Sequence, residues 1–134
     1  MHDSIKRFKN ITSSILSKLE EQKKDKAPKI IAVSKTFNIE KIMPLIDFGH
    51  LDYGENKVQE AIDKWSDIKL KNSKLKLHLI GKLQSNKVKF ALKIFDFIHS
   101  LDSEKLAKKI SNEQLKQKKK IKLFIQVNIG DEEQ

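Results

Sequence analysis

The segment Ile30-Ile-Ala-Val-Ser-Lys35 indicates the fold class, because a short β-branched run ends directly in polar side chains. Such a run is typical of a strand that is buried on both faces of a parallel sheet. Ligands of α/β folds bind at the carboxyl ends of these strands, which is where Lys35 stands. We expect partial burial there to disfavour the ammonium form, so that the amine can attack a carbonyl and form a Schiff base.

The rest of the chain repeats this strand-to-polar pattern in alternation with helical segments. Expected strands cover residues 30–33, 51–54, 75–80, 95–99 and 121–129, and expected helices cover residues 4–22, 38–48, 57–65, 85–93 and 103–117. Asn38, Ser85 and Ser103 are predicted helix N-caps, and Gly49 is predicted to end the second helix in the left-handed conformation. Alternating strands and helices require a parallel sheet with right-handed crossovers, so the fold class is α/β.

Polar side chains follow the predicted strands and should converge on one edge of the sheet. They include Ser34-Lys35, Glu55-Asn56, Gln84-Ser85-Asn86-Lys87, His99-Ser100 with Asp102, and Asn128. Because the carboxyl ends of parallel strands share an edge, this convergence predicts a ligand site. For each residue alone, a helix cap or turn former remains an equally simple explanation.

Composition narrows the classes of function. The chain has 134 residues, about one domain, with no cysteine and a formal net charge of +10. Absence of cysteine fits a reducing cytoplasm, and no apolar run is long enough for a membrane span. The charge comes from lysines with a single arginine, Arg7, and without interleaved aromatic residues, which favours a solvated surface over a nucleic-acid site.

The histidines give no metal or catalytic pattern. His2, His50, His78 and His99 lack paired ligand spacing, so we propose no metal. His99, Ser100 and Asp102 are neighbours in sequence, but members of a catalytic triad must meet through the fold, and we assign no catalytic residue.

Five motifs in order resemble one known family. They are Ala32-Val-Ser-Lys35; Tyr53-Gly-Glu-Asn56 with Val58-Gln-Glu60; His78-Leu-Ile-Gly-Lys-Leu-Gln-Ser-Asn-Lys87; Ile98-His-Ser-Leu-Asp-Ser103; and Ile125-Gln-Val-Asn-Ile-Gly-Asp-Glu-Glu-Gln134. Together they are similar to the YggS/PROSC family of pyridoxal phosphate homeostasis proteins over nearly the whole chain from residue 30. Five motifs in register are far more specific than any single one.

The resemblance implies a parallel (β/α) barrel of TIM type, the pyridoxal phosphate fold-type III barrel seen in the N-terminal domain of alanine racemase. It implies pyridoxal 5'-phosphate as the cofactor, Lys35 as the Schiff-base lysine and Asn56 as a residue near the cofactor. It also implies a carrier or regulator of vitamin B6 pools rather than an enzyme, with pyridoxal phosphate-dependent apoenzymes as partners. An amino-acid racemase or decarboxylase sharing the barrel remains the alternative.

The ending of the sequence departs from that family. The family continues beyond the last motif with about three more strand-helix units, which hold serine, glycine and arginine loops for the cofactor phosphate. We therefore expect residues 1–134 to be the N-terminal part of a single barrel domain that stops after strand five, with residues 1–28 as a leading helix and linker and residues 29–134 as five strands with their helices. Such a stretch should bind the cofactor weakly and self-associate through open sheet edges, although the full-length family is expected to be monomeric.

Overall fold

The structure, a computed structural model, describes residues 2–130 and shows helices and strands in the expected alternation. Its elements are α1 (Asp3–Glu21), β1 (Ala32–Val33), α2 (Ile39–Phe48), β2 (Asp52–Glu55), α3 (Val58–Lys71), β3 (Lys76–Leu79), the 3-10 turn η1 (Ser85–Lys87), α4 (Val88–Ile94), β4 (Phe97–Leu101), α5 (Glu104–Gln117) and β5 (Lys122–Ile125). Among these residues, no helix combines the length and apolar content needed to cross a membrane.

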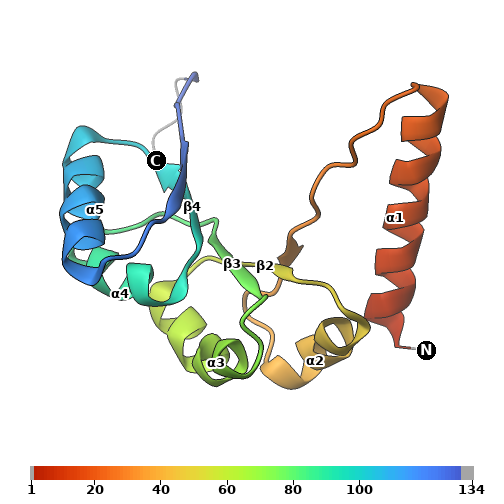
Figure 1. The fold of residues 1–134 in the computed structure, drawn as a ribbon, viewed down its shortest axis with the longest axis horizontal. Coiled ribbons are helices and arrows are strands. Elements are labelled where there is room, and N and C mark those ends of the chain that lie inside the picture. Colours follow the sequence, from red (N-terminus) through yellow and green to blue (C-terminus); the bar gives the residue numbers. More distant parts are fainter. Residues whose placement is uncertain (1, 131–134) are drawn as a thin grey trace.

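The five strands form one parallel sheet in the order β1-β2-β3-β4-β5. Each strand pairs with the next strand in sequence, and a helix lies in every connection. Helices α2 to α5 line one side of the curved sheet, whereas α1 stands apart (Figure 1). This is the winding of a (β/α) barrel, and the five described strands form an incomplete one.

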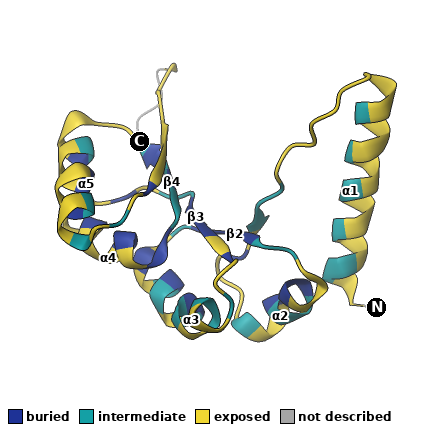
Figure 2. Cartoon of the chain, in the orientation of Figure 1, coloured by how far each residue is buried: buried dark blue, intermediate teal, exposed yellow. Residues whose placement is uncertain are grey.

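The hydrophobic core lies between the sheet and helices α2 to α5. Strand residues that face the helices, including Tyr53, Leu77, Leu79 and Ile98, are almost completely buried, and Trp65 of α3 packs on Tyr53 with ring centroids 4.9 Å apart. Figure 2 shows buried positions concentrated where the strands meet these helices. The same residues alternate along each strand with residues of the other face, as the pleat of a strand requires.

Helix α1 is amphipathic, as the sequence predicts, but it has no buried residue. Phe8 makes its aromatic contacts, with ring centroids 6.1 Å from Phe48 and 4.6 Å from His50. These contacts attach the N-terminal end of α1 to α2, and its other end leads into an exposed linker (Figure 1).

Local signals at several helix ends are confirmed. The Asn38 side chain accepts a hydrogen bond from the amide of Lys41, and that of Ser103 accepts one from the amide of Leu106. Gly49 ends α2 with φ of 109°. The prediction for Ser85 was wrong: Ser85 lies inside the short turn η1, and the residue at the N-cap position of α4 is Lys87.

Other corrections concern strands and one helix. The first strand was expected to be buried on both faces, but β1 has only two residues and Val33 is 49% exposed. It lies at an edge of the sheet, and no described element covers its inner face. Helix α3 runs six residues past the predicted end at Trp65, to Lys71, because Ile68 continues its packed stripe. Strand β4 begins two residues later than expected, and β5 ends at Ile125 rather than residue 129.

The densest lysine run of the sequence, Lys116-Gln-Lys-Lys-Lys-Ile-Lys122, is partly structural. The Nζ of Lys119 donates to the carbonyl oxygens of Leu92 and Phe95, the latter at 2.8 Å, where α4 ends. A cation is favourable at this end of a helix because the backbone carbonyls there are unpaired and the helix dipole is negative. Burial lowers the pKa of Lys119. One member of the run therefore serves the fold, while Lys118 and Lys120 remain exposed.

Candidate functional site

The two predicted site residues lie at the carboxyl edge of the sheet. Lys35 begins the turn after β1, and Asn56 directly follows β2. Gly81, after β3, approaches the Asn56 backbone so closely that an added Cβ would lie 2.5 Å from the Asn56 carbonyl oxygen. No side chain other than hydrogen fits this position, so the loops after β2 and β3 are packed together at this edge.

The environment of Lys35 differs from the sequence-based expectation. Partial burial was expected, but the side chain is exposed. The reason is the position of β1 at the edge of the sheet, where none of residues 2–130 covers the end of the strand. Within residues 2–130, the contacts that constrain this position are those made by its two neighbours in the chain, Ser34 and Thr36.

A buried ionic network holds the residue before Lys35. The Glu55 carboxylate has a fully buried side chain and accepts hydrogen bonds from the Ser34 hydroxyl at 2.5 Å and from the Trp65 indole at 3.2 Å. The ammonium of Lys64 lies 3.1 Å from both Glu55 oxygens and donates to the Ser34 carbonyl oxygen at 2.7 Å. A buried charge pair is tolerated only when its remaining hydrogen bonds are satisfied, as they are here.

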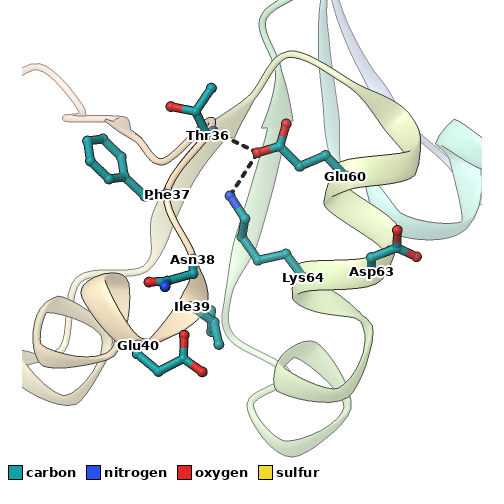
Figure 3. A pocket seen from close by; sticks show the side chains of 8 residues that line it. All are labelled: Thr36, Phe37, Asn38, Ile39, Glu40, Glu60, Asp63 and Lys64. Atoms are coloured by element: carbon teal, nitrogen blue, oxygen red, sulfur yellow. Dashed lines mark hydrogen bonds and ion pairs between the residues drawn. The ribbon is translucent and has the colours of Figure 1, made fainter.

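The same network holds the residue after Lys35. The amide of Thr36 donates to Oε1 of Glu60 at 2.6 Å, and this oxygen also lies 3.2 Å from the Lys64 ammonium. Figure 3 shows both contacts beside an open hollow of about 710 Å³, between the Thr36–Glu40 segment and α3. The hydrogen bond from the Thr36 amide, together with the Lys64 charge, lowers the pKa of Glu60, so its carboxylate stays ionised at neutral pH.

A second polar cluster lies on the inner face of the sheet, away from the helices. Nε2 of His78 lies 2.9 Å from Oδ1 of Asp52, and Nδ1 of His78 lies 2.9 Å from Nε2 of His99. The His78 ring stacks on Phe97, and the His99 ring stacks on Phe124, with centroids 4.2 and 4.5 Å apart. Burial, and then the nearby His78, lower the pKa of His99.

This inner cluster does not form a metal site. Within the described part of the chain, no group of three or more histidine, cysteine or acidic side chains is arranged to hold a metal ion. The two histidines instead satisfy each other and Asp52. Sequence spacing missed this contact, because it depends on the register of three strands.

Sequence reasoning also missed the roles of Glu55, Glu60 and Lys64. Glu55 and Glu60 belong to the motif at Tyr53–Glu60, but the motif predicts no contact for either carboxylate. One signal was available, since Glu60 and Lys64 are four residues apart on a helix, the spacing of favourable ion pairs. The contacts to Ser34 and Thr36 cross from one βα unit to the next and carry no such local signal.

Fold and site together define the class of protein. The family described as "Alanine racemase, N-terminal domain" matches residues 13–133, so the chain belongs to the family of alanine racemase N-terminal barrel domains.

The curated proteins with similar sequences share a more specific name than this family. The pyridoxal phosphate homeostasis protein of Pasteurella multocida is 38% identical over 114 residues, which are 85% of this chain and 49% of the relative. That of Buchnera aphidicola is 41% identical over 104 residues, 78% of this chain and 45% of the relative. The predicted resemblance to the YggS/PROSC family is confirmed.

Solved structures agree with this assignment. PipY of Synechococcus elongatus, solved with PLP bound, is 37% identical with a TM-score of 0.73 and covers 88% of this chain and 55% of PipY. The crystal structure of an unknown protein from Bifidobacterium adolescentis is 28% identical with a TM-score of 0.83, over 99% of this chain and 60% of that one. The chain thus spans about half the length of the curated relatives it matches.

Proposed function

We propose that this chain binds pyridoxal 5'-phosphate and takes part in its homeostasis, with Lys35 as the covalent attachment point. The observation that carries the proposal is an accessible amine at the carboxyl edge of the sheet whose two neighbours in the chain are both anchored by the Glu55–Lys64–Glu60 network. The names of the curated relatives and the PLP bound to PipY support the choice of cofactor.

The described residues fit one end of this cofactor. When bound, pyridoxal phosphate supplies an aldehyde that a lysine amine can capture. Lys35 would provide that amine, and Asn56 would lie beside it at the packed junction with Gly81. Lys82 and Lys87, both exposed after β3, add positive charge near this edge but no amide cradle for a phosphate dianion. We therefore expect residues 1–134 alone to bind the cofactor weakly.

The proposed role is that of a cofactor carrier or regulator in the cytoplasm, passing pyridoxal phosphate to apoenzymes that depend on it. It is supported by the name that the curated relatives share, pyridoxal phosphate homeostasis protein. We also expect chains limited to these residues to self-associate through the outer edges of β1 and β5, although the full-length family is expected to be monomeric. A racemase acting on amino acids is the competing proposal, and measurable racemisation of alanine by the purified protein would favour it.

Absorbance spectroscopy tests the attachment site. On addition of pyridoxal phosphate, we expect the wild-type chain to develop the band of the protein-bound cofactor and the Lys35→Ala variant to lose it. Lys108→Ala, which removes an exposed lysine on α5, is the matched control and should retain the band. A band of wild-type strength in Lys35→Ala would refute the attachment site, and a strong band from a monomer would refute weak binding.

A further inference from the structure

The backbone just after Lys35 is strained. Thr36 has a φ of 66°, in the left-handed region that β-branched residues rarely adopt. Among residues 2–130, two other non-glycine residues share this conformation, Lys23 and Lys118, and each follows a helix, where it is common. Thr36 instead lies between a strand and the next helix. A conformation of this kind persists only where the surroundings hold it.

The Glu60 carboxylate is the group that holds it. The contact of 2.6 Å from the Thr36 amide is short for a hydrogen bond between nitrogen and oxygen, as expected when the acceptor is ionised. Glu60 is held in turn by Lys64, whose side chain is 8% exposed and whose ammonium also binds Glu55 and the Ser34 carbonyl oxygen. The turn therefore has an anchor immediately before and immediately after Lys35.

The distribution of charge in the network indicates that Glu60 serves the Thr36 turn rather than the buried Glu55–Lys64 pair. Two carboxylates, Glu55 and Glu60, share one ammonium, that of Lys64. Glu55 accepts further hydrogen bonds from Ser34 and Trp65, whereas among the described residues the Thr36 amide is the other donor to Glu60. Loss of the Glu60 carboxylate would leave the Glu55–Lys64 pair in place but release the strained residue next to Lys35.

We propose that Glu60 is a positioning residue for Lys35: it fixes the left-handed turn at Thr36 and so sets the direction in which the Lys35 amine meets an aldehyde ligand. The inference rests on the proposed attachment at Lys35. It adds Glu60, a residue of α3 that does not touch the ligand. Glu60 would determine how often the aldehyde is captured at Lys35 rather than at other lysines of the chain.

The test compares three variants of the chain by two measurements. Glu60→Ala removes the acceptor, and Glu60→Gln keeps a neutral acceptor oxygen. Asp63→Ala is the control: it removes a carboxylate that lines the same hollow but accepts its hydrogen bond from Gln59 on the surface of α3. Amide hydrogen exchange at Thr36, followed by NMR, reports the turn. Borohydride fixation of added pyridoxal phosphate, followed by peptide mapping, reports the share captured at Lys35.

We expect Glu60→Ala to speed exchange at Thr36 about tenfold, the effect of losing one hydrogen bond to a charged group, and to lower the share captured at Lys35 by a similar factor. Glu60→Gln should restore part of both values, and Asp63→Ala should match the wild type. Unchanged exchange at Thr36 in Glu60→Ala, or faster exchange with an unchanged share at Lys35, would overturn the proposal.

Two further outcomes separate the causes of failure. If Glu60→Ala unfolds, Glu60→Gln carries the test, and wild-type values for both measurements in that variant would overturn the proposal. If the wild type captures no cofactor at Lys35, the proposed function fails. In that case the exchange measurement still decides whether Glu60 holds the turn.

Discussion

The two faces of the sheet differ in what makes them stable. The face toward α2 to α5 is built from apolar side chains such as Leu77 and Ile98, each fully buried. The inner face carries the Asp52–His78–His99 cluster between Phe97 and Phe124, and Phe124 is 53% exposed. Parallel sheets are usually buried on both faces. Apolar packing against the helices, together with the buried Glu55–Lys64 pair, therefore stabilises one face of this half-barrel, whereas its inner face depends on polar groups that satisfy one another.

The largest expected effect comes from breaking the helix-covered face. Ile98→Ala should lower the free energy of unfolding by about 2–5 kcal/mol, because it leaves a cavity in a fully packed layer. Phe124→Ala, on the neighbouring strand but the inner face, should cost about 1 kcal/mol or less, because much of its ring is already in contact with water. Urea unfolding of both variants measures the difference, and equal losses would contradict the contrast between the faces.

A smaller effect is expected from breaking the inner cluster. Asp52→Ala leaves Nε2 of the buried His78 without its partner, and an unsatisfied buried donor costs about 1–3 kcal/mol. Lys29→Ala is the matched control, since this exposed lysine lies 3.8 Å from the same carboxylate and a surface pair contributes about 0–1 kcal/mol. A loss in the control as large as that in Asp52→Ala would mean that charge, rather than satisfaction of His78, stabilises the inner face.

The smallest effect expected is a dependence of stability on pH at His99. Burial lowers the pKa of His99 in the folded chain, so the unfolded chain binds more protons between that pKa and the ordinary value of 6.5. Stability is therefore fully present above 6.5 and is lost as the pH falls toward the folded pKa. His50, whose pKa is also lowered by burial, acts in the same direction.

The His99→Gln variant isolates the contribution of His99. It removes the titrating ring while keeping a polar side chain opposite His78. Thermal unfolding of the variant and the wild type across this pH range should show a shallower decline in the variant. Identical slopes would assign the whole dependence to His50 or to other groups.

The sequence was sufficient for features that depend on neighbouring residues. The caps at Asn38 and Ser103, the stop at Gly49 and the alternation of strands and helices each arise within a few residues, and the structure has them. The length of β1 and the exposure of Lys35 depend on what covers a sheet edge, which no local pattern contains. The inner cluster depends on register between strands more than twenty residues apart. The anchoring of Thr36 by Glu60 depends on the approach of two successive βα units.

The lysine-rich run lies beside the open edge of β5, where its charge affects the solubility of the chain. All four residues of β5 are exposed, and no strand among residues 2–130 pairs with that edge. Such a β-prone, apolar edge is a template for pairing with another chain. Lys118, Lys120 and Lys122 are exposed beside it, so two chains that approach edge to edge bring like charges together. In a chain limited to these residues, we therefore expect the three lysines to slow, without abolishing, the self-association proposed above.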